Sequence, residues 1–212
     1  MDRFLHLSAL FIILTLYSPA YGAKSYPPRF PIYENGRAGF IDKSGTVVIK
    51  PRFDWTDEYF RGPYCRASLK KKMGIIDRSG KWVIQPRFFS IGYPSGGYVT
   101  VSDKKYKSAF VSMKGVRLTP YIYDRIEPFL RGECLVVKGD KYGILNSSLK
   151  PLIPIVYDHL TPFRDGLAVA KRRGSFLLIN RKNQQVKLLP YDRVQPMEQH
   201  FKVVLNKKEG LL

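Results

Sequence analysis

The chain repeats itself with a fixed period. Residues 39–53 read GFIDKSGTVVIKPRF, and residues 74–88, 35 positions later, read GIIDRSGKWVIQPRF. Further short apolar runs that end in a polar residue begin at Ala109, Gly143 and Leu177, so the four successive spacings are 35, 35, 34 and 34. An aromatic residue closes each copy 14 positions after its first residue: Phe53, Phe88, Tyr123, Tyr157 and Tyr191. Such a period predicts units that bury their apolar faces only by stacking on one another.

Each unit reads as short β-strands. A strand such as GFID is followed by a polar turn (KSG), a second strand (TVVI), a Pro-marked loop and a third strand that enters the next unit through a Lys-rich turn. Gly45 and Gly80 supply the positive φ of the polar turn. The recurring prolines are predicted to end the second strand; they are Pro51, Pro86, Pro120, Pro154 and Pro190.

These patterns predict an all-β tandem repeat of about five 34-residue units of short antiparallel strands. We expect an open hairpin array, because three strands per unit are fewer than the four that are usual in propeller blades. A propeller-like ring is the alternative. The repeat domain spans 37–212, with units that start near 37, 72, 107, 141 and 175 and a truncated sixth unit from 208; residues 23–36 form a partial repeat or N-terminal cap.

The first 22 residues are predicted to be a signal peptide. Arg3 precedes an apolar run from Phe4 to Tyr17, and small residues around Gly22 form a cleavage site. An uncleaved membrane anchor is the alternative, although the run is shorter than the roughly 20 apolar residues that usually span a bilayer. We therefore expect an exported protein, either periplasmic or secreted.

The repeated pattern GxIDxxGxxVIxPxF, followed by a segment such as TPFRDGLAVAK at 161–171, resembles the WG repeat family, also met as KWG repeats. The resemblance extends from about residue 36 to residue 212. The Trp that names the family is absent, since the residues before the five unit starts are Ala38, Met73, Ser108, Tyr142 and Phe176. The resemblance implies tandem β-rich units that act as an interaction or scaffold module.

The chain is strongly basic. It contains 36 Lys and Arg against 17 Asp and Glu, a formal net charge of +19. This charge predicts attraction to polyanions. The basic residues gather at the turn before each first strand: Lys70, Lys71, Lys72, Lys104, Lys105, Lys107, Lys138, Lys141, Lys171, Arg172, Arg173, Lys207 and Lys208. We predict that this column binds an anionic partner: an envelope polymer, a membrane surface or an acidic protein. Nucleic acid is a further candidate, without specificity.

Lys-rich turns also protect β edges from aggregation, so a scaffold with no electrostatic ligand is the main alternative. A second, weaker basic column, at the opposite end of the first strand, contains Lys43, Arg78, Lys114 and Arg181. An envelope-polymer hydrolase is a more distant alternative, because its candidates Asp57, Glu58 and His159 have no supporting neighbours in the sequence. We expect no enzyme, no catalytic residue, no metal site and no cofactor.

Two further sets of residues follow the register. An Asp comes directly after the closing aromatic in four units, at Asp54, Asp124, Asp158 and Asp192, and we interpret it as the acceptor of a local Asx-type turn. Cys65 and Cys134 occupy near-equivalent sites two units apart. In a regular array their Cα atoms lie beyond the ~7 Å limit for a disulfide. Two free thiols are therefore predicted.

Overall fold

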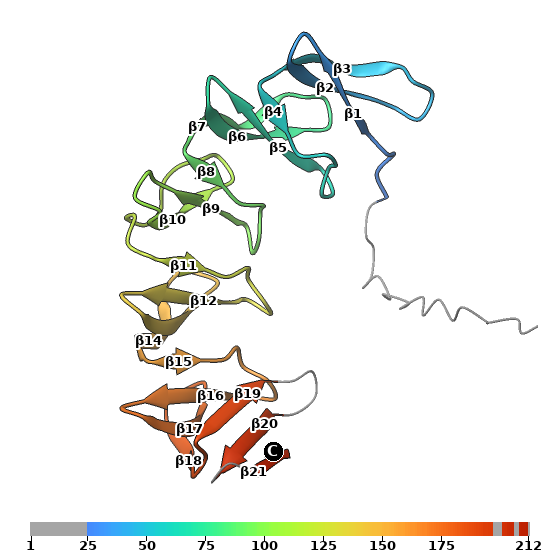
Figure 1. The fold of residues 1–212 in the computed structure, drawn as a ribbon. Helices are drawn as coiled ribbons and strands as arrows, with labels where there is room; N and C mark the ends of the chain where they lie inside the picture. The colour runs from blue at the N-terminus through green and yellow to red at the C-terminus, as the bar shows by residue number, and fades with distance from the viewer. Residues whose placement is uncertain (1–24, 197–200, 206–207, 212) are drawn as a thin grey trace, which may run out of the picture.

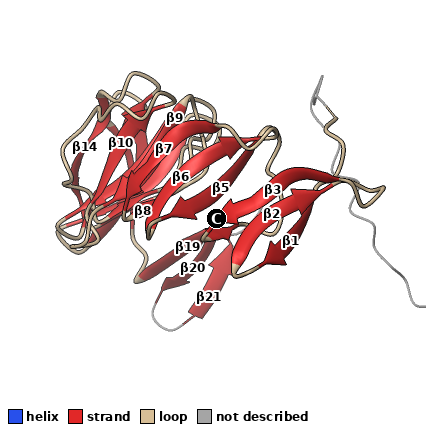
Figure 2. Ribbon diagram, turned by 90° about the horizontal axis from the view of Figure 1, so that it is seen from above, coloured by secondary structure: helices blue, strands red, loops and turns tan. Residues whose placement is uncertain are grey.

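The computed structural model describes residues 25–196, 201–205 and 208–211. The predicted signal peptide at 1–22 and Lys207 lie outside these ranges. Within them the regular structure consists of β-strands, with no helix. Figure 2 shows strands joined only by loops and turns. The all-β prediction is confirmed.

The strands form six antiparallel sheets. Sheet 1 contains β1 (Phe30–Glu34), β2 (Arg37–Ile41) and β3 (Val47–Phe53). Sheet 2 contains β4 (Trp55–Thr56), β5 (Tyr64–Leu69), β6 (Lys72–Asp77) and β7 (Trp82–Phe88). Sheet 3 contains β8 (Ser90–Ile91), β9 (Tyr98–Ser102) and β10 (Ser108–Ser112). Sheet 4 contains β11 (Arg125–Ile126), β12 (Glu133–Lys138), β13 (Lys141–Asn146) and β14 (Pro151–Tyr157). Sheet 5 contains β15 (His159–Leu160), β16 (Leu167–Arg172), β17 (Ser175–Asn180) and β18 (Gln185–Leu189). Sheet 6 contains β19 (Arg193–Pro196), β20 (Phe201–Leu205) and β21 (Lys208–Leu211).

The six sheets follow one another along an open arc. In Figure 1 the arc runs from β1–β3 at the upper right to β19–β21 at the bottom, and its two ends lie apart. The structure is therefore the open hairpin array that the sequence predicts, and the alternative ring does not form.

Sheets and repeat units are out of phase. Sheet 2 takes β5 from the unit that starts near 37 and β6 and β7 from the unit that starts near 72, and sheets 4 and 5 are built in the same way. In sheets 2, 4 and 5 a fourth strand of only two residues pairs with the next strand. The prediction of three strands per unit misses this strand, because two residues leave no periodic pattern in the sequence.

Three of the five recurring prolines do not end the second strand. Pro51, Pro86 and Pro154 lie inside β3, β7 and β14. Pro190 directly follows β18, as predicted, and Pro120 lies outside the strands. Ala38 pairs with Phe53 and Phe40 with Ile49, so the one residue of β2 between these pairs faces three residues of β3, and the strand bulges where Pro51 lies. A bulge leaves a backbone group unpaired, which is why a residue without an N–H is accepted there.

The bulge explains the glycine that begins three of the units. A Cβ built on Gly39 would lie 2.4 Å from the carbonyl oxygen of Ile49 and 2.6 Å from the nitrogen of Pro51. Gly74 is crowded in the same way, with the carbonyl oxygen of Ile84 at 2.4 Å. The anchor glycine is thus required by close backbone approach.

The polar turns behave as predicted, and they contain the true Asx turns. Gly45 and Gly80 have φ of +83° and +84°. The Asp42 carboxylate accepts hydrogen bonds from the backbone N–H groups of Ser44 and Thr46, at 2.9 and 3.1 Å. Equivalent acceptors stand at Asp77, Asn146 and Asn180. The residue that closes the GFID strand therefore shapes the turn after it.

The hydrophobic core is a series of layers between neighbouring sheets. Phe40 and Phe53 of sheet 1 pack with Cys65, Ala67 and Ile76 of sheet 2, and all five side chains are buried. Each later pair of neighbouring sheets has its own cluster. A sheet therefore buries its faces only against its neighbours, as expected for a repeat protein.

Both cysteines lie in these layers. Cys65 and Cys134 are buried and free. Burial raises the pKa of each thiol to about 12. The thiols are therefore core residues with little nucleophilic character.

Candidate functional site

The predicted basic residues lie at one end of the sheets. Successive hairpin turns of an antiparallel meander alternate between two ends, so the turns before β2, β6, β10, β13 and β17 form one row. We call this row the turn ridge; it comprises residues 35–36, 70–71, 103–107, 139–140 and 173–174. The opposite ends of the strands form the loop face, which carries the Asx turns and the loops 57–63, 92–97, 127–132 and 161–166.

The structure brings most of the predicted site residues together on or beside the turn ridge. The exposed ones are Lys70, Lys71, Lys72, Lys104, Lys105, Lys138, Lys141, Arg172, Arg173 and Lys208. Lys107 and Lys171 are half-buried, and the ammonium of Lys171 lies 5.0 Å from the ring centroid of Phe176.

The lysines of the second turn adopt an unusual backbone conformation. Lys70 and Lys71 have φ of 51° and 59°, in the left-handed region. In sheet 1 the equivalent two-residue turn is Asn35–Gly36, the pair that this turn type favours. Lysine gains nothing from a left-handed conformation, so the fold alone does not account for Lys70 and Lys71.

Two of the ridge cations are used to join sheets. Lys141 of sheet 4 forms an ion pair with Asp158, whose other carboxylate oxygen accepts a hydrogen bond from the backbone N–H of Arg173 in sheet 5 at 2.9 Å. Asp124 binds Lys107 of sheet 3 in the same way, and the N–H of Gly139 in sheet 4 at 2.7 Å.

A third such clamp joins sheets 1 and 2. Asp54 binds Arg37 and accepts a hydrogen bond from the N–H of Lys71 at 3.1 Å. The recurring Asp is predicted to form a local Asx turn, and that interpretation is wrong for Asp54, Asp124 and Asp158. It accepts a backbone N–H from the turn of the following sheet, some 15 to 17 residues away. This pairing is non-local and leaves no trace in the neighbouring sequence.

The clamp is missing between sheets 2 and 3, where Phe89 takes the place of the Asp. Lys72 occupies the position of the clamping cation, 17 residues before Phe89, as Lys141 stands 17 residues before Asp158. The Phe89 ring contacts Tyr106, in the ridge turn of sheet 3. We call the Asp-containing connections clamped joints and this one the open joint.

The same two sheets are tied together on the loop face. Arg66 of β5 forms a two-pronged ion pair with Asp57, with N···O distances of 2.9 and 2.8 Å, and the hydroxyl of Tyr93 in sheet 3 donates to the same carboxylate. Burial alone would raise the pKa of Asp57, but the hydrogen bonds from Arg66 and Tyr93 outweigh it and lower the pKa. This network was not predictable from the repeat pattern, because Arg66 and Tyr93 do not recur in the register.

The hydrolase candidates do not form a catalytic group. Asp57 is held as a carboxylate by Arg66 and Tyr93. His159 lies beside Tyr142, and burial, helped by the charges of Lys171 and Arg125, lowers its pKa. Glu58 is exposed in the same loop as Asp57. Asp57 and Glu58 lie in a loop of sheet 2 and His159 lies in β15 of sheet 5, so the structure does not bring the three candidates together.

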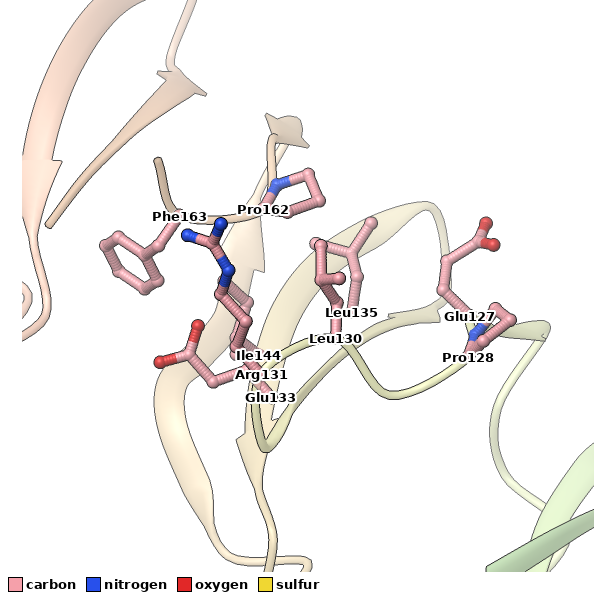
Figure 3. A pocket seen from close by; sticks show the side chains of 9 residues that line it. All are labelled: Glu127, Pro128, Leu130, Arg131, Glu133, Leu135, Ile144, Pro162 and Phe163. Carbon is pink, nitrogen blue, oxygen red and sulfur yellow. The ribbon is translucent and has the colours of Figure 1, made fainter. Parts of the chain in front are cut away.

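The loop face contains pockets between neighbouring loops. Figure 3 shows one of about 340 Å³, with Leu130 and Leu135 of sheet 4 between Glu127 on one side and Phe163 of sheet 5 on the other. Arg181 closes the joint beside it by pairing with Glu133 and lying over the ring of Phe163. A second, larger pocket of about 610 Å³ lies among the loops of sheets 2, 3 and 4.

The second basic column lies on the loop face, in the turns after β2, β6, β10 and β17. Arg78 lies over the ring of Phe60 at 4.8 Å and donates to the carbonyl oxygen of Gly62 at 3.1 Å, and Arg181 makes the contacts described above. Lys43 and Lys114 are exposed in their turns. In the part of the chain that the structure describes, no cluster of three or more His, Cys, Asp or Glu could hold a metal ion. That part also contains no helix suited to crossing a membrane.

The family model of the WG containing repeat matches residues 39–72, 73–106 and 142–175. No curated protein sequence matches the chain. Among solved structures, a eukaryotic initiation factor aligns with a TM-score of 0.53 at 10% identity, over 89% of this chain and 60% of the other. BamB from Moraxella catarrhalis aligns with a TM-score of 0.41 at 10% identity, over 82% and 68%. The WD40 β-propeller domain of Doa1 aligns with a TM-score of 0.32 at 11% identity, over 87% and 78%. At these identities the first likeness concerns the fold alone, and the chain spans only 60% of that factor's length.

Proposed function

We propose that this chain, which contains WG repeats, is a non-catalytic binding module that engages an extended anionic polymer along its turn ridge. The observation that carries the proposal is the pair Lys70–Lys71, two lysines in left-handed conformation at a turn for which the same chain elsewhere uses Asn-Gly. A non-Gly residue held in this conformation costs about 1–3 kcal/mol, and such strain is typical of functional positions.

The charge of the ridge supports the same function. Ion pairs with the clamp Asp residues occupy Lys107 and Lys141, whereas the lysines at the turn tips, such as Lys70 and Lys105, are exposed. Sheets that stack face to face lie about 10 Å apart, so cationic turns recur along the arc at roughly that interval. A row of this kind matches a chain-like polyanion better than a single small anion.

Export supplies the setting for such a partner. We propose, on the predicted signal peptide at 1–22, that the protein acts in the periplasm or outside the cell. The competing function is a protein-interaction scaffold, and the pockets of the loop face favour it, since they are lined largely by apolar side chains such as Leu130, Leu135 and Phe163.

Two triple variants of equal charge distinguish these functions. K70N/K71G/K72Q removes three charges from the turn ridge, and K43Q/K114Q/K182Q removes three exposed lysines from the loop face. We expect the ridge variant to bind fluorescently labelled polyphosphate about tenfold more weakly than wild type at 100 mM salt. The loop-face variant should retain most of the affinity.

Salt dependence provides the second readout. The affinity of wild type should fall steeply between about 50 and 500 mM salt, and the slope of log affinity against log salt should be shallower for the ridge variant. An affinity that does not change over this range would contradict the electrostatic mechanism. Equal losses in the two variants would show that the charge acts without a defined ridge site.

A further inference from the structure

Two aromatic rings lie exposed at the open joint. Phe89 is 43% exposed and Tyr106 is 74% exposed. Their ring centroids are 5.8 Å apart and the rings meet edge to face at 83°. Tyr106 has φ of 59° and so holds a left-handed position at the ridge turn between β9 and β10. An exposed aromatic pair on a strained turn is not explained by core packing.

Lysines flank this pair on both sides. Met73 pairs with Phe88, so the next residues, Lys72 and Phe89, lie side by side at the edge of sheet 2. At the clamped joints an Asp neutralises the equivalent cation, and here Phe89 replaces it. On the other side, Lys104 and Lys105 are exposed beside Tyr106.

The carboxylate in the same turn, Asp103, makes local hydrogen bonds. Asp103 accepts hydrogen bonds from the backbone N–H groups of Lys105 and Lys107, at 2.9 and 3.0 Å, and thereby shapes the turn. The aromatic patch therefore consists of Lys72, Phe89, Lys104, Lys105 and Tyr106. It combines two exposed rings with three ammonium groups.

We propose that the aromatic patch is a base-binding subsite, which makes single-stranded nucleic acid the anionic polymer of the turn ridge; this inference rests on the proposed function. A base stacks on an exposed ring while the phosphates on either side of it meet Lys72 and the pair Lys104–Lys105. Aromatic platforms interleaved with cations are the usual means of binding single strands without sequence preference.

Two other anionic partners, an acidic polysaccharide and a membrane surface, fit the aromatic patch less well. Sugar hydroxyl groups need acceptors as well as donors, and the lysines of the patch offer only donors. A membrane surface calls for aromatic residues spread over a plane. Here the clamped joints carry Asp54, Asp124 and Asp158 at the position of Phe89, so an aromatic residue takes this position at one of these joints only.

The test compares two oligomers of equal charge. The full chain is titrated with a fluorescent dT12 oligonucleotide and with an abasic deoxyribose-phosphate 12-mer, at 100 mM salt. We expect dT12 to bind about 5- to 150-fold more tightly than the abasic oligomer, which is the gain in affinity expected from the stacking of one base. Y106N, which suits the left-handed turn, should lose this preference and keep the affinity for the abasic oligomer.

Y59N serves as the matched control, since Tyr59 is 56% exposed on the loop face; it should retain the preference. Equal affinity of wild type for dT12 and the abasic oligomer would overturn the base subsite and leave the polyanion function standing. Weak binding of both oligomers and of polyphosphate would overturn the two together. A Tyr106-dependent preference for an acidic polysaccharide such as hyaluronate over dT12 would assign the patch to sugar rings and overturn this inference.

Discussion

The joint between sheets 4 and 5 and the joint between sheets 2 and 3 use the same position of the repeat in opposite ways. At the first, Asp158 neutralises Lys141 and binds the backbone of the next turn. At the second, Phe89 leaves Lys72 unclamped and contacts an exposed Tyr106.

The second joint is nevertheless held together, on the other face. Tyr93 of sheet 3 donates to Asp57 of sheet 2, and Arg66 donates to the carbonyl oxygen of Ile91 at 3.3 Å. Arg87 adds a hydrogen bond to the carbonyl oxygen of Gly115. With this tie on the loop face, the ridge side of the joint is left without an ion-pair clamp. Recurrence of a residue in such a chain therefore indicates structure, and a departure from the recurrence indicates where to look for function.

The largest effect is expected from removing the loop-face tie. D57A leaves the Arg66 guanidinium and the Tyr93 hydroxyl without their acceptor, and we expect a loss of about 2–3 kcal/mol in the free energy of unfolding. Urea denaturation followed by tryptophan fluorescence measures it. E58A, an exposed neighbour in the same loop, is the control and should change stability little. A loss below about 0.5 kcal/mol in D57A would show that the network does not hold the open joint.

The same network predicts a dependence on pH. The pKa of Asp57 is lowered on folding, because the hydrogen bonds from Arg66 and Tyr93 outweigh the effect of burial. Its contribution to stability is therefore fully present above the ordinary Asp pKa of about 3.9 and is lost as the pH falls through the lower folded value. The difference in unfolding free energy between wild type and D57N should narrow from pH 6 to pH 3. A difference that stays constant over this range would exclude a lowered pKa at Asp57.

A smaller effect, of opposite sign, is expected at the ridge. K70N/K71G gives the second turn the sequence of Asn35–Gly36, which suits its left-handed conformation, and should raise the free energy of unfolding by about 1 kcal/mol. The same variant should bind polyphosphate more weakly. The reciprocal change N35K/G36K should destabilise sheet 1 by a similar amount. If K70N/K71G lowers stability, the lysines are structural and the central observation for the proposed function falls.

The smallest change in stability is expected from converting the open joint into a clamped one. In F89D the ring contact with Tyr106 is lost and an exposed ion pair with Lys72 is gained, so the free energy of unfolding should stay within about 1 kcal/mol of wild type. The preference for dT12 over the abasic oligomer should disappear. F89L removes the ring without adding a charge, so it distinguishes the effect of losing the ring from the effect of pairing Lys72 with a carboxylate. Retention of the preference in F89D would place the stacked base elsewhere.

The sequence was sufficient for those features that depend on local chemistry repeated many times. The register follows from the 34- to 35-residue period, and the β-strands and the left-handed Gly45 and Gly80 follow from patterns within one unit. The open array was predicted correctly, although the three strands per unit on which that prediction rested become four in sheets 2, 4 and 5. The predicted role of Pro51 was wrong, because the position of a bulge depends on how the strand pairs with its partner strand. The clamping role of Asp158 was also missed, since its partners lie in two different sheets.

The site was only partly predictable. The lysines of the turns recur from unit to unit and were therefore predictable. Tyr93, Phe89 and Tyr106 each occur in one unit and were not. Phe89 was nevertheless visible as the exception where other units have Asp after the closing aromatic. Its meaning depends on the exposed contact with Tyr106, which only the folded chain shows.

The phase difference between sheets and repeat units has a genetic consequence. Because β5 comes from one unit and β6 and β7 from the next, the boundary between two copies in the gene falls inside a sheet. In-frame loss or gain of 34 or 35 codons by recombination between copies then rejoins equivalent strands and leaves every remaining sheet complete. The length of the arc can therefore change by whole repeats during evolution while each sheet keeps its packing against its neighbours.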